Sequence, residues 1–184
     1  LFLKESNQKL AQENLDLRNK LALVTSKLEK QQLADVDTSI NTQFIFSPAI
    51  IVNNSINKQH NFLTLNVGSS AGVEKEMGVV TNDGIIGIIA GVSSNYSTVI
   101  SLLNVDLKIS AKLKKSNHFG SLYWDGRNYR EVILTDIPQH VPISIGDTVV
   151  TSGFSSIFPP EVRIGTIKSF DSKGSNFYTI RVLL

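Results

Sequence analysis

Residues 78–103 read GVVTNDGIIGIIAGVSSNYSTVISLL, and this stretch decides the fold class. Short runs of Val and Ile alternate with clusters of Gly, Asn, Asp and Ser, which is typical of β-strands separated by tight turns. Asn82-Asp83-Gly84 is a strong hairpin signal, because Asp-Gly accommodates the positive φ of a two-residue turn. The stretch therefore predicts three consecutive strands, with a tight hairpin between the first two.

The same texture extends from Phe44 to the end of the chain, without a second long helical pattern. We expect strands over residues 44–52, 61–67, 78–82, 85–92, 97–103, 107–113, 118–124, 130–135, 147–151, 162–170 and 176–183. Further turns are expected at 145–147 and 174–176. The positions expected to shape turns and bends are Gly68, Gly72, Gly84, Gly87, Gly146, Asp147, Gly153 and Gly165. So many short strands favour small closed or nearly closed barrels, which protect strand edges.

The first 35 or so residues differ, because they lack Gly and Pro and are rich in helix formers. Apolar and Asn side chains recur every seven residues, which predicts a coiled coil over 1–37. The seam consists of Leu3, Leu10, Leu17 and Val24 at d and Asn7, Asn14, Leu21 and Leu28 at a. A buried Asn finds its partner on an identical, in-register helix, so the pattern favours a parallel dimer. The alternative is a single helix folded back onto its own β region.

Composition excludes several functional classes. The chain has 184 residues, no Cys, 18% charged residues and a net charge of +2. Disulfides, thiolate zinc sites and cysteine nucleophiles are thereby excluded, and the small charge argues against nucleic-acid binding. Because the sequence begins inside a helical pattern and holds no apolar run long enough for a membrane span, we expect it to be cut from a longer protein with its anchor upstream.

No catalytic or metal-binding constellation stands out. His60, His118 and His140 lack ligand spacing, so neither a metal nor a cofactor is expected. A triad of Ser152, His140 and Asp147 is conceivable, but its members lie within a dozen or so residues of one another, whereas triads draw on distant parts of a chain. We therefore expect a protein that is not an enzyme.

An apolar cluster stands out in a loop rich in Ser, Gly and Pro. It consists of Phe154, Ile157 and Phe158. Exposed apolar loops mark partner sites, whereas buried ones close the end of a barrel, and the sequence leaves both interpretations open.

The β region contains an ordered set of glycine- and valine-rich segments: Leu65–Val73, Met77–Val80, Gly84–Ile89, Ser97–Leu103, Gly146–Gly153, Phe158-Pro159 and Val162–Ile167. In order and spacing, these segments resemble motifs of the MreC family of bacterial rod-shape proteins. One departure is Pro160-Glu161, where the family often has Gly or a basic residue. A coiled coil also stands where the family has one, so the resemblance covers residues 1–184.

The resemblance implies a mainly β fold, with an N-terminal coiled coil followed by two small β-barrel-like subdomains. One would comprise 44–58 plus 115–184, and the other, over 60–114, would be inserted into it. It also implies a single-pass inner-membrane protein facing the periplasm, which organises cell-wall elongation with a class B penicillin-binding protein and its glycosyltransferase partner, MreD and MreB. The alternative is a periplasmic adaptor of a transport or secretion machine, whose coils are usually antiparallel hairpins.

Overall fold

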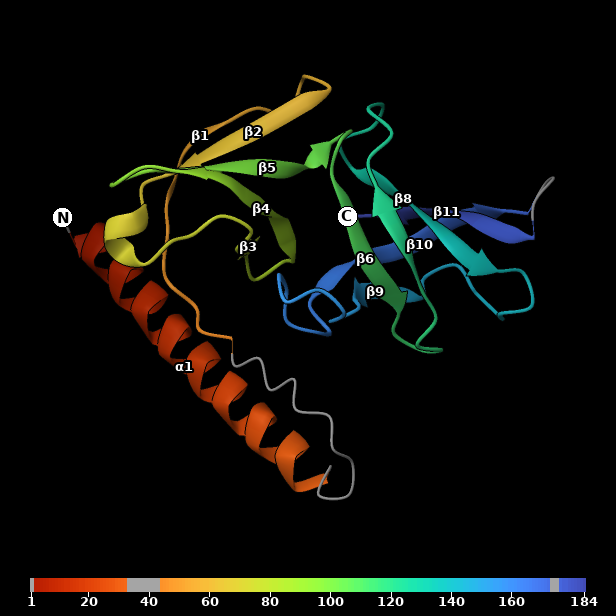
Figure 1. Cartoon of the computed structure of the whole chain (residues 1–184), viewed down its shortest axis with the longest axis horizontal. Helices are drawn as coiled ribbons and strands as arrows, with labels where there is room; N and C mark the ends of the chain where they lie inside the picture. Colours follow the sequence, from red (N-terminus) through yellow and green to blue (C-terminus); the bar gives the residue numbers. More distant parts are fainter. Residues whose placement is uncertain (1, 33–43, 173–175) are drawn as a thin grey trace. The chain divides into compact units, whose positions relative to one another are not determined.

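The computed structural model describes residues 2–32, 44–172 and 176–184. The chain divides into two compact units, Leu1–Ala49 and Ile50–Leu184. Within these described residues, the first unit contains the α-helix α1 (Phe2–Gln32) and the second contains eleven strands (Figure 1). The predicted helix over 1–37 is confirmed as far as Gln32, and residues 33–37 lie outside the described residues.

The strand predicted at 44–52 is placed too early. The observed strand β1 spans Ile51–Asn54, and residues 44–50 are irregular. Pro48 lies in this stretch and has no backbone N–H for a ladder. The backbone N–H and C=O of Phe46 instead bond to the side chain of Asn19 in α1.

The first five strands of the second unit form an open sheet in the order β1-β2-β5-β4-β3. After β1 come β2 (His60–Leu65), β3 (Gly78–Val80), β4 (Ile85–Val92) and β5 (Ser97–Asn104). A short 3-10 helix η1 (Ser69–Ala71) lies between β2 and β3. The predicted hairpin at 82–84 is confirmed, because β3 and β4 pair antiparallel and Thr81 N–H donates to Gly84 O at 2.7 Å.

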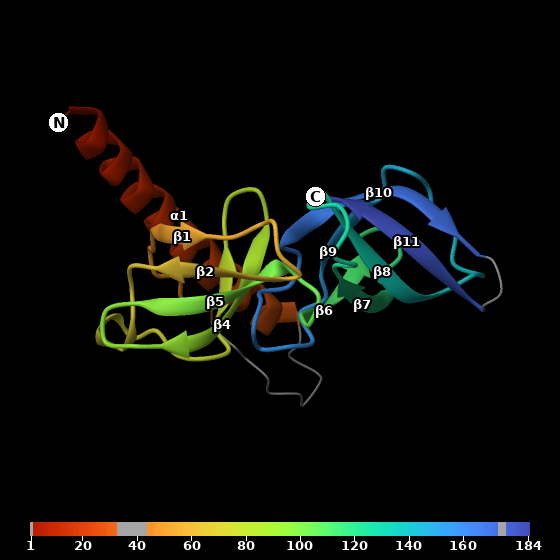
Figure 2. The same cartoon turned by 90° about the horizontal axis from the view of Figure 1, so that it is seen from above.

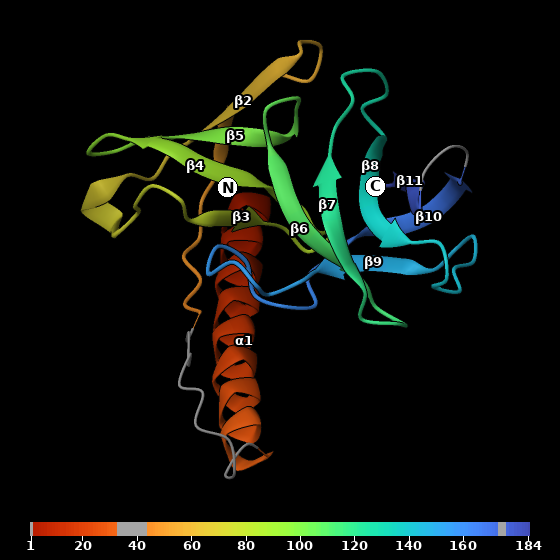
Figure 3. The same ribbon diagram turned by 45° about the vertical axis from the view of Figure 1, so that its right-hand side comes forward.

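The last six strands close into a barrel in the order β10-β11-β8-β7-β6-β9 (Figure 2). They are β6 (Lys108–Leu113), β7 (Phe119–Tyr123), β8 (Glu131–Pro138), β9 (Thr148–Thr151), β10 (Arg163–Asp171) and β11 (Phe177–Leu183). The short strand β9 bridges β6 and β10, and this pairing closes the barrel; Figure 3 shows β6 and β9 side by side. Closure leaves none of these six strands as a full edge.

Two predictions about the β region are wrong. Only one of its two parts is a closed barrel, because β1 and β3 do not pair and leave the other part an open sheet. The predicted division is also wrong, since β1 pairs with β2 in the sheet and β6 pairs with β7 in the barrel. The two parts therefore follow one another along the chain, and neither is inserted into the other.

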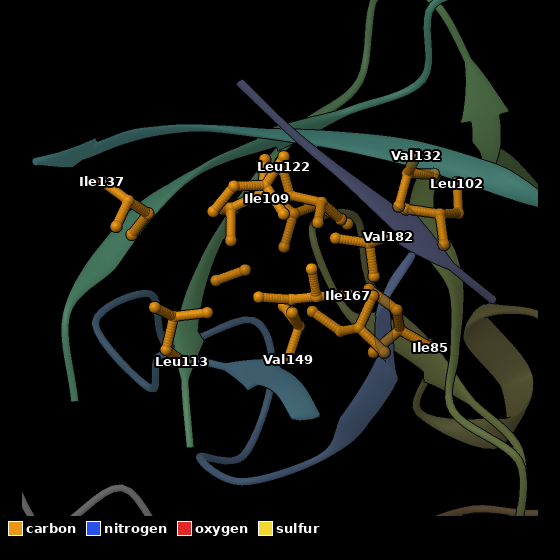
Figure 4. Packing of buried hydrophobic residues seen from close by; sticks show 14 of the residues in the cluster. Ile85, Leu102, Ile109, Leu113, Leu122, Val132, Ile137, Val149, Ile167 and Val182 are labelled. Carbon is orange, nitrogen blue, oxygen red and sulfur yellow. The ribbon is translucent and has the colours of Figure 1, made fainter. Parts of the chain in front are cut away.

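A continuous hydrophobic core joins the sheet to the barrel. Leu102 of β5 and Ile85 of β4 belong to the same buried cluster as Val132, Val182 and the other barrel residues. Figure 4 shows Leu102 beside Val132 at this junction. A second, smaller cluster consists of Leu63, Leu65, Val73, Ile89 and Val99 and lies within the sheet region. Because apolar side chains from both parts are buried together, the sheet and the barrel form one folded body.

Buried amides reinforce this junction where the chain passes from β5 to β6. Asn61 is fully buried and donates to Leu103 O at 2.7 Å and to Lys58 O at 2.6 Å. Asn104 donates to Asn61 O at 3.2 Å and accepts from Asp106 N–H at 3.0 Å. Buried amides are costly unless they are bonded, so this network specifies one arrangement of the connection.

Most of the predicted turn positions lie in turns or loops. Gly68 and Gly72 flank η1, Gly84 closes the hairpin between β3 and β4, and Gly153 follows β9. Gly146 and Asp147 precede β9, and the Asp147 carboxylate accepts from Ser144 N–H at 2.8 Å. Gly87 and Gly165 lie inside β4 and β10, within the strands predicted at 85–92 and 162–170, so neither of them forms a turn. The turn at 174–176 lies largely outside the described residues.

Candidate interaction surfaces

The heptad seam of α1 is open to solvent. Leu10, Leu17 and Leu21 are 55%, 64% and 67% exposed. Every seam residue with a described side chain is exposed: Asn7, Leu10, Asn14, Leu17, Leu21 and Val24. The side chains of Leu3 and Leu28 lie outside the described part. An apolar stripe left this open on a long helix is suited to a partner helix.

A different face of α1 is contacted by the chain's own return segment, residues 44–49. The Asn19 carboxamide accepts from Phe46 N–H at 2.9 Å and donates to Phe46 O at 3.4 Å. The Arg18 guanidinium carbon lies 6.0 Å from the centre of the Phe46 ring. Leu15 and Ala22 on the same side are half-buried. At 3.6 residues per turn, this face is centred about 120° from the seam, so the return segment leaves the seam uncovered.

Phe154 is the exposed part of the predicted contact cluster. It is 70% exposed, and its ring meets that of Phe119, which is 58% exposed, edge to face at 4.8 Å. Ser152 Oγ donates to Ser110 Oγ at 2.8 Å and accepts from Phe154 N–H at 3.2 Å, which fixes the base of the loop. A shallow hollow of about 330 Å³ adjoins the pair, and it is lined by Lys108, Ile109, Ser110, Phe119, Gly120, Ser121 and Asp136. Two large, exposed rings held in one geometry form a suitable anchor for a partner.

Phe158 belongs to the core instead of to a contact surface. It is 2% exposed and packs in the cluster that joins barrel and sheet. Its ring lies over Gly78 of β3, where an added Cβ would come within 2.6 Å of two ring carbons. Thr151 Oγ1 holds the loop closed by donating to Pro159 O at 2.6 Å. The burial of Phe158 contradicts its prediction as an exposed contact residue and favours the plug interpretation, while Ile157 is half-buried beside it.

The charged groups make local pairs on the barrel surface. Lys168 Nζ lies 2.6 Å from Glu131 Oε1, and Arg181 lies 3.7 Å from the other oxygen of the same carboxylate. The hydrogen bond from Lys168 holds the pKa of Glu131 below its ordinary value, the charges of Lys168 and Arg181 act in the same direction, and burial opposes them. Lys112 Nζ lies 2.5 Å from Glu161 Oε1.

The residues considered for a serine triad have other partners. Ser152 bonds to Ser110, Asp147 caps the turn at Ser144, and the His140 ring meets His118 edge to face at 6.3 Å. A triad would need the His to link the other two side chains. Among the residues that the structure describes, no three His, Asp or Glu side chains gather in a way that would hold a metal ion.

Two contributors were not found from the sequence. In β7, Phe119 is exposed and its neighbour Gly120 is buried, as the alternation of side chains along a strand predicts. That alternation does not predict the contact between Phe119 and Phe154. The contact between Asn19 and Phe46 spans 27 positions and has no local signal.

The family model for the barrel core of the rod shape-determining protein MreC matches residues 51–184, which is more than half of the chain. The chain belongs to the MreC family. The matched residues span both the open sheet and the barrel, so the resemblance seen in the ordered motifs is confirmed.

Individual relatives agree with this assignment. The cell shape-determining protein MreC of Listeria monocytogenes is 29% identical over 173 residues, which cover 92% of this chain and 57% of that protein. The chain spans about half the length of the curated relatives it matches. A solved MreC structure from Listeria has a TM-score of 0.68 at 27% identity and covers all of this chain and 87% of its own.

A third neighbour is a complex between the penicillin-binding protein PBP2 and MreC from Helicobacter pylori. It has a TM-score of 0.59 at 22% identity and covers 75% of this chain and 87% of that one, so it supports the fold alone. Within the described ranges of this chain, no helix combines the length and apolar character needed to cross a bilayer.

Proposed function

We propose that this chain is a non-enzymatic periplasmic scaffold, which dimerises through a parallel coiled coil of α1 and organises the cell-wall elongation machinery that maintains rod shape. The observation that carries the proposal is the open heptad seam on a face that the return segment leaves free. An isolated helix of this kind is marginal in water, and a second copy would cover its Leu and Asn side chains.

In this proposal, the dimer presents two β bodies as a repeated docking surface. Paired weak contacts then bind a multivalent partner more tightly than a single contact would. The partners that we propose are a class B penicillin-binding protein, MreD and MreB. We also propose that a membrane anchor lies upstream of Leu1. Membership of the MreC family supports this proposal. The Helicobacter pylori complex supports it too, because it contains the penicillin-binding protein PBP2 bound to another MreC. The MreC assignment also favours this function over a transport adaptor.

Dimerisation is tested by sedimentation of the chain at tens of micromolar. We expect a dimer for the unmodified chain and a monomer for Leu17→Asp, because a carboxylate facing its twin in a seam is desolvated and repelled. The dissociation constant should rise roughly 100-fold, equivalent to about 2.7 kcal/mol. Gln12→Asp introduces the same charge on the exposed face outside the seam and should leave the dimer unchanged. A monomeric unmodified chain at these concentrations would refute the proposal.

The partner surface is tested with Phe154→Glu. It should abolish binding to the class B penicillin-binding protein of the same organism without changing the circular dichroism spectrum, because Phe154 is exposed. Ile145→Glu is the matched control, since Ile145 is 72% exposed in a different loop of the barrel. Equal binding by Phe154→Glu and the control would place the partner elsewhere.

A further inference from the structure

A polar hollow lies on the barrel, where β10 and β11 extend on the side away from the open sheet (Figure 1 and Figure 2). Its volume is about 590 Å³, within the range of small-molecule sites, roughly 300–1,000 Å³. The lining residues are Ser169, Phe170, Asp171, Thr179 and Arg181. None of them lines the hollow beside Phe119 or belongs to the proposed coiled coil, so the function proposed above does not use this site.

Four polar side chains of the lining form a regular array on the two strands. Ser169 is paired with Arg181, and Asp171 is paired with Thr179. Alternate residues of a strand point to the same face, and directly opposed Cβ atoms lie about 4.5–5.5 Å apart. Ile180, which lies between Thr179 and Arg181 in β11, is buried in the core, so the array faces outward. The hollow therefore presents hydroxyl, carboxylate and guanidinium groups side by side.

Two carboxylates position Arg181 at one end of this array. Its Nη1 lies 3.7 Å from Asp125 Oδ2 and 3.7 Å from Glu131 Oε2. Both distances are longer than a hydrogen bond, and a guanidinium carries five N–H donors. The side chain is 43% exposed, so its donors can reach a ligand in the hollow.

Phe170 adds one apolar surface to the polar lining. It is 40% exposed, and its ring meets that of Tyr178 edge to face at 5.4 Å. Tyr178 is itself held in place, because its hydroxyl donates to Gln139 O at 2.9 Å. A fixed aromatic ring beside hydroxyl and charged groups suits a ligand with one apolar face and a polar rim.

We propose that this hollow binds a sugar chain. A pyranose ring has an apolar face of C–H groups, which packs on Phe170, and a rim of hydroxyls that both donate and accept hydrogen bonds. Asp171 accepts such bonds, Arg181 donates them, and the two hydroxyl side chains do both. Because the lining carries one cation and one anion, it favours a neutral ligand over a phosphate or a polyamine.

The kind of sugar rests on the proposed function, whereas the sugar-binding chemistry of the hollow does not. A protein of the cell-wall elongation machinery meets glycan strands whose sugars carry acetamido groups. An acetamido group offers one N–H and one C=O to the same array of donors and acceptors. The ligand is therefore a chain of N-acetylated sugars.

Nuclear magnetic resonance titration of the whole chain with chitotetraose, a chain of four N-acetylglucosamine units, tests the proposal. The amide signals of residues 169–171 and 179–181 should shift. Thr179→Val removes one hydroxyl with little change of shape and should weaken binding about 5-fold, and Asp171→Ala should weaken it at least about 10-fold. The matched control is Thr98→Val, at an exposed position of β5 outside the hollow, which should bind like the unmodified chain.

Two results would overturn the proposal: no shift of these amides at about 10 mM chitotetraose, or equal affinities for Thr179→Val and the control. Loss of binding to the penicillin-binding protein in Thr179→Val, with unchanged affinity for chitotetraose, would also overturn it and assign the hollow to a protein partner. Equal binding of cellotetraose, which lacks acetamido groups, would support a sugar site and refute the choice of N-acetylated sugars. A monomeric chain that still binds chitotetraose would refute the proposed scaffold and leave the sugar site standing.

Discussion

Replacing Phe158 with Ala should destabilise the β unit more than any exposed substitution, because its ring fills the junction between sheet and barrel. Phe158 is 2% exposed and packs in the same cluster as Trp124 and Ile164. Removing a buried Phe side chain costs about 3–5 kcal/mol through lost transfer free energy and the cavity left behind. We expect the upper half of that range, because the cavity can collapse only if the barrel loop and β3 both move.

Urea unfolding monitored by fluorescence measures this loss, because Trp124 is the only tryptophan and is buried in the barrel core. For an m-value near 2 kcal/mol per molar urea, a loss of about 4 kcal/mol lowers the midpoint by roughly 2 M. Phe154→Ala is the matched control. Its ring is 70% exposed, and losing its contact with Phe119 should cost about 1 kcal/mol. Equal midpoints for the two variants would refute the assignment of Phe158 as a structural plug.

Three further predictions concern the same unit. Gly78→Ala should destabilise the fold by about 1–3 kcal/mol in the same urea assay, because its methyl group would overlap the ring of Phe158; an unchanged midpoint would show that the ring moves freely. Glu131→Gln should be less stable than the unmodified chain at pH 7 and equally stable in acid. The pKa of Glu131 is lower in the folded state than in the unfolded state, where it is about 4.3. Its carboxylate therefore stabilises the fold at pH values above the unfolded pKa. This stabilisation is lost as the pH falls through the pKa of the folded state. A difference between the two chains that persists at pH 2 would contradict this cause. Asn61→Ala should cost about 1–3 kcal/mol by leaving a buried carbonyl unsatisfied, and thermal unfolding followed by circular dichroism checks it; a loss below 0.5 kcal/mol would show that water replaces the amide.

The individual strands follow from the sequence, whereas their grouping does not. The runs around 85–92 and 97–103 carry their own β-branched pattern and turn signals, and the structure places strands there. Which strands pair is decided by contacts between distant segments. Closure of the barrel depends on the four-residue strand β9, which pairs with the next strand β10 but also with β6, far earlier in the sequence. Nothing local to residues 148–151 indicates those partners.

The apolar loop shows the same limit at the level of single residues. Phe154 and Phe158 have similar neighbours in sequence, yet one is exposed and the other is buried. The difference arises because a glycine at position 78, eighty residues earlier, leaves room for a ring. The available signal in the sequence was Gly78, a small residue at the start of an edge strand. It indicates room for the Phe158 ring only once β3 is known to face that loop.

The return segment also determines which part of α1 can act as a spacer. It meets the helix at Asn19, so about 26 Å of helix precede the point where the chain departs and about 20 Å follow it, at 1.5 Å per residue. Heptads inserted before Asn19 would lengthen the stalk between Phe2 and that departure point. Heptads inserted after it would instead lengthen the part of the helix that lies beyond its contact with the return segment.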